Sequence, residues 1–457
     1  MVLFYKTTNL LIMLKRLILN DLDNWRTSPL RRPLVLRGAR QVGKTIVARL
    51  LGQQYAHFTE LNMERAGDAQ LFKRGLSAEE IIQAIKLKHG IPSDSSSWLL
   101  FIDEIQAYPP AVAMLRYFHE DTPDVHLLAA GSLLEVALQR EHISFPVGRV
   151  EFRYLYPMNF EEFVQALAPN ALDVYHTVPS PTYAEDVLFP LYHKYALIGG
   201  LPQAVAAYAE TGDVVAVNTI YENLFAAYLD DIPKYAQTDG TRRIIRHCLR
   251  SAPLFAGTRI HFAGFGESSY GSRECGEALR TLEQVMLLSL IYPSTATEIP
   301  LIRNLRKSPR LQFLDTGLLH YLSNIQSESI GIQDLSDAFR GRLLEQITGQ
   351  ELLARRHDLR EPPLFWVRDK TQSQAELDFL EAHEGKPIPV EVKSGPAGKL
   401  RSLHEFMQRS PNAELAIRLY RGRYDQQDVN QNNRRYKLIN IPYYHAAKIH
   451  DYIASAA

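Results

Sequence analysis

One glycine-rich stretch constrains this chain more than any other feature, the sequence GARQVGKT at residues 38–45. It has the spacing Gly-x-x-x-x-Gly-Lys-Thr, it follows the apolar run PLVL, and it precedes TIVARLLGQQ, whose apolar positions recur with helical spacing. A strand, a glycine loop and a helix in that order predict a phosphate-binding loop (P-loop) in an α/β fold with a parallel sheet. The glycines let backbone N–H groups turn toward phosphate oxygens at the start of the helix.

Each polar position of this loop has a predicted role. Lys44 is expected to reach the β and γ phosphates of a nucleotide, and Thr45 to offer its hydroxyl to Mg²⁺. ATP and Mg²⁺ are therefore the expected ligands. The other loop residues are expected to line the phosphates with backbone groups, and they are Gly38, Ala39, Arg40, Gln41, Val42 and Gly43.

A P-loop also predicts an acidic strand, because the metal needs a further carboxylate and hydrolysis needs a group that positions water. The segment SSWLLFIDEIQ supplies one. Residues 98–102 are almost continuously apolar, as in a strand covered on both faces, and Asp103 and Glu104 follow at its end. We expect Asp103 to hold Mg²⁺ and Glu104 to orient the attacking water. An Asp-Glu pair alone would equally suit a solvated helix start, and the upstream loop favours the functional role.

Two further polar residues are candidates for the same site. Ser132 follows a third expected strand, DVHLLAAGS, and could sense the γ-phosphate or merely cap a helix. Arg149 lies on a glycine turn and could act as an arginine finger, within the subunit or across a homo-oligomer interface. It could also be a surface arginine in an ordinary turn.

Bulk composition bounds the remaining possibilities. A chain of 457 residues predicts two to four domains, and 51 Lys plus Arg against 51 Asp plus Glu restrict any nucleic-acid site to a local patch. Only two cysteines occur, which is typical of a reducing compartment and disfavours zinc. The apolar start is interrupted by Lys6, Lys15 and Arg16, which favours an amphipathic helix over a signal peptide. We expect a cytoplasmic protein without a membrane partner.

Further segments follow in a specific order: AAGS, PVGRVEFRYLYPMNFEEF, LIGGLPQAV, YLDDIPKYA and QFLDTGLLHYL. Together with LRGARQVGKT and LLFIDEIQ, they resemble successive blocks of the bacterial and archaeal AAA-type ATPases whose C-terminal half is a domain of unknown function numbered 4143. The resemblance covers nearly the whole chain and implies a Mg²⁺-dependent nucleotide-binding domain. It assigns the loop role to Gly38, Gly43, Lys44 and Thr45, and the acidic-strand role to Asp103 and Glu104. Ser132 departs from the Asn that many related ATPases have at the sensor position.

The middle of the chain changes character twice. Residues 161–238 show apolar residues at helical spacing and predict a helical lid, in which Tyr192, Tyr195 and Tyr228 are core residues rather than a stacking platform. Residues 239–335 favour a winged helix-turn-helix, with a recognition helix at residues 273–290. The basic stretch Arg303, Arg306, Lys307 and Arg310 could then contact DNA phosphates. A protein-binding fold with a solvated basic face is the open alternative.

The C-terminal part contains a second constellation. AELDFLEA and PIPVEVKS predict a hairpin around residues 383–386 that brings together Asp378, Glu391 and Lys393, with FWVRDK as the preceding strand and Glu345 on an upstream helix. The order resembles restriction-endonuclease-like nucleases. Asp378, Glu391 and Glu345 could share a second divalent metal, and Lys393 could stabilise charge on a scissile phosphate. Such a domain could also be an inactive binding module.

These observations predict four segments. They are an AAA-like P-loop core at residues 1–160, a helical lid at 161–238, a winged-helix-like segment at 239–335 and a nuclease-like α/β domain at 336–457. The expected function is ATP hydrolysis at Lys44 and Glu104, coupled to DNA binding or processing by the C-terminal domain. The competing hypothesis is a nucleotide-controlled switch that binds a protein partner and carries an inactive nuclease-like domain.

Overall fold

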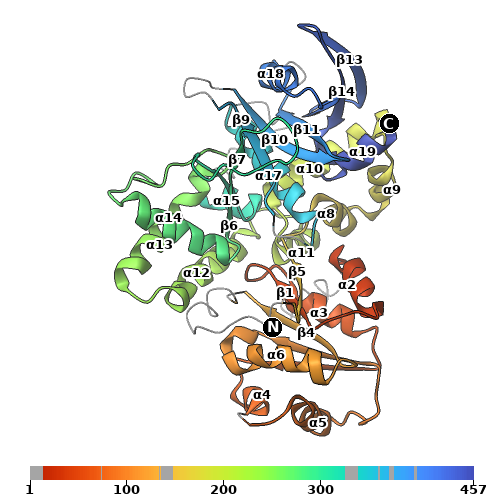
Figure 1. Cartoon of the computed structure of the whole chain (residues 1–457), viewed down its shortest axis with the longest axis vertical. Coiled ribbons are helices and arrows are strands. Elements are labelled where there is room, and N and C mark those ends of the chain that lie inside the picture. The colour runs from red at the N-terminus through yellow and green to blue at the C-terminus, as the bar shows by residue number, and fades with distance from the viewer. Residues whose placement is uncertain are drawn as a thin grey trace.

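The computed structural model describes residues 14–73, 75–132, 134, 148–324, 338–358, 361–369, 375–395 and 399–456. The expected N-terminal amphipathic helix lies mainly outside these residues, as does the expected segment boundary at residue 335. In Figure 1 the N-terminal sheet, in red to orange, and the C-terminal sheet, in blue, occupy opposite ends of the molecule, with helices between them. The chain is therefore an α/β protein with two sheet-containing ends.

Within the described residues, five parallel strands form the N-terminal sheet in the order β2-β3-β4-β1-β5. Along β1, Leu34 and Leu36 enter one apolar core and Val35 enters another, because successive side chains of a strand alternate between faces. The sheet is therefore buried on both sides, as a parallel P-loop sheet requires. Its elements are α2 (Ile18–Thr27), β1 (Leu34–Arg37), α3 (Lys44–Gly52), β2 (His57–Asn62), α4 (Ala66–Ala69), α5 (Ala78–His89), β3 (Trp98–Asp103), α6 (Pro109–Asp121), β4 (His126–Gly131) and β5 (Glu151–Tyr154).

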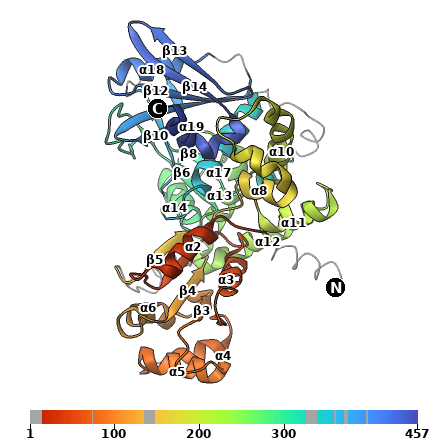
Figure 2. The same ribbon diagram turned by 90° about the vertical axis from the view of Figure 1, so that its right-hand side faces the viewer.

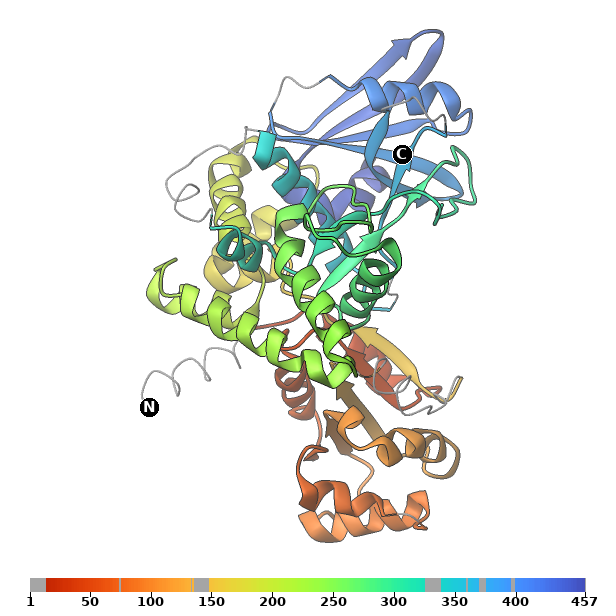
Figure 3. The same ribbon diagram turned by 90° about the vertical axis from the view of Figure 1, so that its left-hand side faces the viewer.

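The lid is helical, as the sequence predicts. Figure 2 shows α2 on the side of the N-terminal sheet that faces the lid, and Figure 3 shows α12 lying across the molecule between the two sheets. Tyr192, Tyr195 and Tyr228 are buried, which confirms that they are core residues. The lid helices are α8 (Phe160–Leu167), α9 (Leu172–His176), α10 (Glu185–Ile198), α11 (Pro202–Thr211) and α12 (Asn218–Tyr235).

The next segment places two packed helices before an antiparallel strand pair, β6 with β8. The helix expected at residues 273–290 is shorter than predicted, because Met286 adopts a left-handed backbone conformation (φ 61°) and the chain re-emerges as β6. Residues 288–290 are therefore strand rather than helix. The elements are α13 (Asp239–Ser251), α14 (Ser272–Gln284), β6 (Leu288–Ile291), β7 (Pro293–Ser294), β8 (Arg310–Phe313) and α15 (Thr316–Leu322).

The C-terminal sheet has the strand order β13-β14-β12-β11-β10-β9-β7 among the described residues. The expected hairpin is confirmed: β10 pairs with β11, and Glu384 and Gly385 turn the chain with positive φ angles. The expected strand FWVRDK is present in part, because β9 contains its FWV and ends at Val367, before Arg368. The elements are α17 (Ala338–Ala354), β9 (Leu364–Val367), β10 (Glu376–His383), β11 (Lys386–Lys393), α18 (Arg401–Arg409), β12 (Leu415–Tyr420), β13 (Asp425–Gln431), β14 (Arg434–Pro442) and α19 (Ile449–Ala456).

A buried polar junction connects the lid to α17. The side chain of Glu351 on α17 is fully buried, and its Oε1 accepts hydrogen bonds from the Phe160 N–H (2.9 Å) and the Tyr195 hydroxyl (2.7 Å). Burial raises the pKa of Glu351 to about 8. Oε2 has no hydrogen-bond partner among the described residues, which suits a protonated carboxyl.

No helix in the described part of the chain is long and apolar enough to cross a membrane.

The junction predicts a pH-dependent stability. A carboxyl whose folded-state pKa is near 8 and whose usual pKa is near 4.5 binds its proton more tightly in the folded state, so stability should fall as pH rises between these values. Glu351→Gln keeps the amide oxygen as acceptor and removes the titration. We expect the free energy of unfolding, measured by urea denaturation at pH 5, 6.5 and 8, to decline less in Glu351→Gln than in the unmodified protein, by on the order of 3 kcal/mol in all. The exposed Glu210→Gln should decline as the unmodified protein does, and identical declines for all three would refute the assignment.

Candidate functional site

The P-loop connects β1 to α3 in a conformation that needs its glycines. A Cβ on Gly38 would lie 2.5 Å from the Leu155 carbonyl oxygen, and Gly43 has a φ of 100° just before the helix. The first backbone hydrogen bond of the helix runs from the Val47 N–H to the Gly43 carbonyl at 2.9 Å. The N–H groups of residues 44–46 precede it and point toward the loop, as at any helix start. This is the donor arrangement that binds phosphate.

Lys44 lies at the centre of the loop. Its ammonium Nζ donates to the carbonyl oxygens of Gly38 (3.0 Å) and Ala39 (2.8 Å), and its side chain is buried. Burial lowers its pKa, and the nearby carboxylates of Glu104 and Asp103 oppose that shift. The loop therefore holds a desolvated cation among backbone groups, where an anion would be a stronger partner than the carbonyls.

The acidic strand meets the loop directly. Thr45 donates its hydroxyl hydrogen to Asp103 Oδ2 at 2.8 Å, and burial raises the pKa of Asp103. Glu104 follows with a left-handed backbone conformation (φ 48°), and its Oε2 accepts from Gln106 Nε2 at 2.5 Å. The structure thus brings together the residues that the sequence predicts for metal and water positioning.

Ser132 directly follows β4, which lies between β1 and β3 in the sheet. Its position is therefore between the P-loop that follows β1 and the acidic pair at the end of β3. It is half-buried and lines a cleft with Arg40, Tyr228, Asp231, Tyr235, Val285 and Leu287. The predicted sensor position therefore faces the same cleft as the tip of the P-loop.

The lid holds that tip. Asp231 on α12 binds Arg40 Nη1 with both carboxylate oxygens, at 2.8 and 2.6 Å, and Lys234 lies 2.9 Å from Asp231 Oδ1. The Tyr228 hydroxyl donates to the Arg40 carbonyl at 3.1 Å. Because Arg40 is a loop residue, any rearrangement of the loop around phosphate would act on α12.

A buried arginine supports the loop from behind. Arg16 donates to the carbonyl oxygens of Val42 and Tyr156, each at 2.7 Å, and its Nε lies 3.0 Å from Glu162 Oε2. Both charged side chains are about 4% exposed or less. Arg16 therefore joins the P-loop, the segment after β5 and the lid helix α8.

Arg149 lies apart from this site. It precedes β5, whose Glu151 is paired with Leu34 at the start of β1, so Arg149 lies at the amino-terminal edge of the sheet. The P-loop follows the opposite, carboxyl-terminal edge. Arg149 pairs instead with Glu120 of α6 at 2.8 Å. This position does not suit a finger acting on a nucleotide in the same chain and leaves the role across an interface as a hypothesis.

The C-terminal candidates are brought together by the hairpin. The Lys393 ammonium lies 2.5 Å from Glu391 Oε1, which confirms that the two side chains share a face of β11. Asp378 Oδ2 accepts from the Val392 N–H at 2.7 Å. Burial, together with the charge of Asp378, raises the pKa of Glu391 to about 8, and the same causes raise the pKa of Glu345 to about 8.

A buried arginine occupies this acidic cluster. Arg310 donates to the Asp378 carbonyl (2.8 Å) and to Glu376 Oε1 (2.6 Å), and it lies 3.4 Å from Glu345 Oε2. Its guanidinium also lies over the Phe365 ring, 4.6 Å from the centroid. The prediction that Arg310 contacts DNA phosphates is wrong, because this side chain is buried among carboxylates.

The acidic cluster does not have the donor arrangement of a metal site. Among the residues that the structure describes, no three His, Cys, Asp or Glu side chains are arranged to hold a metal ion. Arg310 and Lys393 already supply positive charge to the carboxylates of Glu345, Glu376, Asp378 and Glu391. The observed donor set therefore does not fit the second divalent metal that the sequence suggested.

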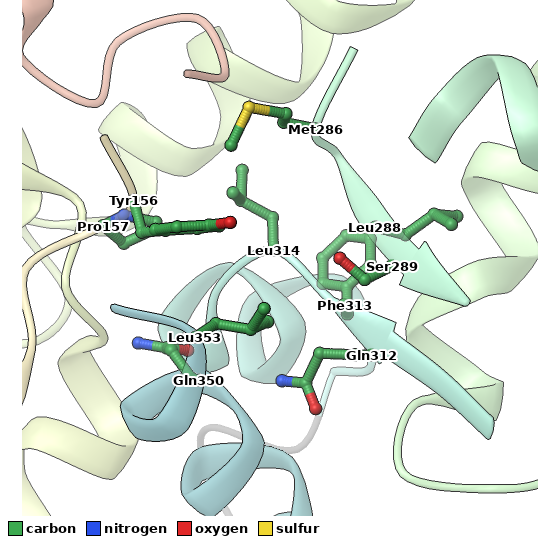
Figure 4. A pocket seen from close by; sticks show the side chains of 10 residues that line it. All are labelled: Tyr156, Pro157, Met286, Leu288, Ser289, Gln312, Phe313, Leu314, Gln350 and Leu353. Carbon is green, nitrogen blue, oxygen red and sulfur yellow. The ribbon is translucent and has the colours of Figure 1, made fainter. Parts of the chain in front are cut away.

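A pocket lies where the segment after β5, the β6–β8 pair and α17 meet. Figure 4 shows Met286 and Leu314 near Tyr156, with the amide of Gln350 below Tyr156 in the view and beside Leu353. The Gln350 side chain donates to the Tyr195 hydroxyl (2.9 Å) and accepts from the Thr316 N–H (3.2 Å). Its polar groups are thus engaged in joining elements, and we assign it no ligand.

Sequence reasoning missed the residues that connect these segments, namely Arg16, Asp231 and the clustered role of Arg310. Asp231 had a signal, because it lies in the block YLDDIPKYA that carries part of the family resemblance. No sequence signal pointed to the roles of Arg16 and Arg310. Both lie in basic stretches, where sequence alone favours solvent.

Comparison with known families divides the chain into three matched regions. Residues 30–164 match the model of an AAA domain, residues 190–329 match a domain of unknown function numbered 8612, and residues 340–444 match the domain of unknown function numbered 4143. The first match contains the P-loop and the acidic strand. The third contains the hairpin and the acidic cluster.

Two curated relatives are the uncharacterized protein Rv2008c of Mycobacterium tuberculosis and the uncharacterized protein Mb2031c of Mycobacterium bovis. Each is 25% identical over 412 residues, which cover 85% of this chain and 76% of the relative. Similar solved structures include the Walker-type ATPase PABY2304 of Pyrococcus abyssi, at 15% identity and TM-score 0.43, covering 67% of this chain and 94% of that one. The ORC2 protein of Aeropyrum pernix in its ADPNP and ADP complexes has 13% identity and TM-score 0.35, covering 68% and 92%.

Arg16 provides a test of the support behind the loop. Arg16→Ala leaves the carboxylate of Glu162 buried without its cation, so we expect the free energy of unfolding to fall by about 3–5 kcal/mol. Arg26→Ala is the matched control, because Arg26 belongs to the adjacent helix and makes a partly exposed pair with Asp23. Its loss should cost about 0.5 kcal/mol or less. Equal urea midpoints for the two variants would contradict the proposed support.

Proposed function

The chain is an AAA-type P-loop ATPase with a C-terminal domain of unknown function 4143, and from this premise we propose that it couples Mg²⁺-dependent ATP hydrolysis to DNA binding. The observation that carries the catalytic part is the hydrogen bond between Thr45 and Asp103. It joins the hydroxyl and the carboxylate that P-loop enzymes use at their metal. Their shared position beside Lys44 supports a site for the phosphate end of ATP.

These side chains fit magnesium, because a hydroxyl and a carboxylate are oxygen ligands and lie within one hydrogen bond of each other. Magnesium would supply charge neutralisation at the phosphates. Lys44 would exchange its bonds to the Gly38 and Ala39 carbonyls for phosphate oxygens. The loop N–H groups would orient the phosphates, Glu104 would position water, and Ser132 would contact the γ-phosphate side of the site.

The link between nucleotide and lid is proposed to be Arg40. Its bidentate pair with Asp231 holds the P-loop tip to α12, so a loop that closes on phosphate would pull on the lid. In this proposal residues 1–160 bind the nucleotide, 161–238 form the lid, and 239–335 and 336–457 respond as winged-helix-like and nuclease-like domains. An oligomer in which Arg149 reaches a neighbouring nucleotide remains part of the proposal. A cytoplasmic location is supported by the free, buried thiols of Cys248 and Cys275.

A second candidate function is favoured by the position of Arg310. A guanidinium bound to Glu345, Glu376 and the Asp378 carbonyl supports a nuclease-like domain that does not cleave and serves as a binding module. The chain would then be a nucleotide-controlled switch. Its partner could be a protein instead of DNA, and the response of hydrolysis to DNA separates the two.

The catalytic proposal predicts a defined loss of turnover. We expect Lys44→Ala and Glu104→Gln each to lower steady-state ATP hydrolysis by roughly 100-fold or more, because one removes the phosphate cation and the other the water-positioning carboxylate. Glu104→Gln should still bind ATP. Lys73→Ala, an exposed lysine of the same domain, is the control. Duplex DNA should accelerate the unmodified protein. Normal hydrolysis by Lys44→Ala would refute the site, whereas Lys44-dependent turnover that ignores DNA would favour the protein switch.

The position of Arg310 predicts that the C-terminal domain does not cut DNA. Supercoiled plasmid incubated with the full chain and Mg²⁺ or Mn²⁺ should remain supercoiled, because the acidic cluster already holds two cations of its own. Glu391→Ala and Lys393→Ala are assayed in parallel. Nicking by the unmodified protein that both variants lose would contradict this prediction and restore a metal-dependent nuclease.

A further inference from the structure

Helix α13 carries a stripe of arginines. Arg242, Arg243, Arg246 and Arg250 recur at three- and four-residue spacing, so they share one face of the helix. Arg243 and Arg250 are exposed, and Arg242 and Arg246 are half-buried. The opposite face buries Ile245, Cys248 and Leu249. Packing of that apolar face therefore fixes the direction in which the arginines project.

Only one arginine of this stripe has an acidic partner among the described residues. Arg242 pairs with Asp239 at 2.9 Å and donates to the Ala236 carbonyl. Within the part of the chain that the structure describes, Arg243, Arg246 and Arg250 have no carboxylate within ion-pair distance. Three guanidinium groups are thus available to a ligand, in a chain whose overall charge is zero.

The neighbouring helix differs in this respect. On α14, Arg273 pairs with Glu277 at 2.9 Å, and Arg280 lies over the Phe262 ring, 5.5 Å from its centroid. Glu274 is also exposed on that helix. The helix that the sequence suggested for DNA recognition therefore presents mixed charge, whereas α13 presents arginine. The basic surface therefore lies on α13 and not on α14, where the sequence suggested it.

We propose that this α13 face binds the phosphate backbone of duplex DNA. Arginine presents a planar fork of donors that matches phosphate oxygens, and a cluster of four arginines of which only Arg242 is paired with a carboxylate attracts a polyanion. Residues 243 and 250 are separated by about 10 Å along the axis at 1.5 Å per residue, which lets one helix contact successive phosphates or bridge the edge of a groove about 12 Å wide. Such contacts provide affinity and orientation without reading sequence.

The position of α13 connects this surface to the nucleotide site. The helix begins four residues after α12 ends, and Arg242 bonds to the connecting Ala236. Asp231, near the end of α12, holds Arg40 of the P-loop. Figure 1 places α13 beside α14 at the left-hand side of the molecule. The inference rests on the proposed coupling of ATP to DNA, but it does not need ATP hydrolysis to be measured.

The test compares DNA retention by the full chain and an α13 variant. Arg243→Gln/Arg246→Gln/Arg250→Gln removes three positive charges, and Arg65→Gln/Lys73→Gln/Arg116→Gln removes three exposed charges from the N-terminal segment as control. Binding of a fluorescent 30-base-pair duplex is followed by anisotropy between 50 and 200 mM salt. We expect the α13 variant to bind about tenfold or more weakly and to lose about 2.7 from the slope of log K against log salt, at 0.9 for each phosphate contact. The control should match the unmodified protein.

The outcomes separate this inference from the proposed function. An unchanged urea unfolding midpoint establishes that the α13 variant is folded, and a double variant, Arg243→Gln/Arg250→Gln, should lose about 1.8 from the slope if the triple variant unfolds. Equal DNA binding by the α13 variant and the control would overturn the α13 assignment while leaving ATP–DNA coupling intact. No DNA binding by the unmodified protein would overturn both the α13 assignment and the DNA part of the proposed function, but not its ATPase part.

Discussion

The arrangement of the lid and the segments around it depends on the hydrogen bonds that the buried carboxylate of Asp315 accepts. It is fully buried, and it accepts hydrogen bonds from the Gly200 N–H (2.6 Å) and the Leu318 N–H (3.0 Å). A Cβ on Gly199 would lie 2.2 Å from Asp315 Oδ1, so the lid loop can approach only as glycine. Burial raises the pKa of Asp315 to about 6, and its backbone hydrogen bonds oppose this shift. Burying this carboxylate without its hydrogen-bond donors would cost several kcal/mol of folding free energy. The junction therefore favours the one arrangement that places the Gly200 and Leu318 N–H groups beside it.

From this junction, contacts extend in both directions. Toward the nucleotide site, the Gly200 carbonyl accepts from the Met158 N–H at 2.6 Å, and Tyr156 two residues earlier accepts from Arg16, which also holds the P-loop at Val42. Toward the C-terminal domain, β8 leads from Asp315 back to Arg310 in the acidic cluster.

The geometry thus provides a short covalent and hydrogen-bonded path between the two candidate sites. Rigid elements joined by buried polar contacts are the kind of structure through which one site can bias another.

The sequence predicts the local features of both sites well, for local reasons. Glycine spacing, strand alternation and a two-residue turn are properties of neighbouring residues, so the P-loop, the acidic strand and the β10–β11 hairpin follow from the sequence. The end of α14 was mispredicted because the mainly apolar residues 285–290 continue a plausible helix, and only the left-handed Met286 reveals the turn into β6. Strands β11 and β12 pair in parallel although α18 lies between them in the sequence. No local sequence pattern specifies such a pairing.

The environment of an arginine side chain is the feature that the sequence predicts least well in this chain. Arg310 belongs to a basic stretch and is buried among carboxylates contributed by α17 and β10, whereas Arg243 and Arg250 belong to the arginine-rich helix α13 and remain exposed. A guanidinium stays charged in either place, so its role is decided by whether folding brings acids to it. The four carboxylates near Arg310 lie 35 to 81 residues further along the chain. Only tertiary structure could remove Arg310 from the set of DNA contacts, and the same reasoning directs attention to α13, where folding supplies few acids and leaves the positive charge to a partner.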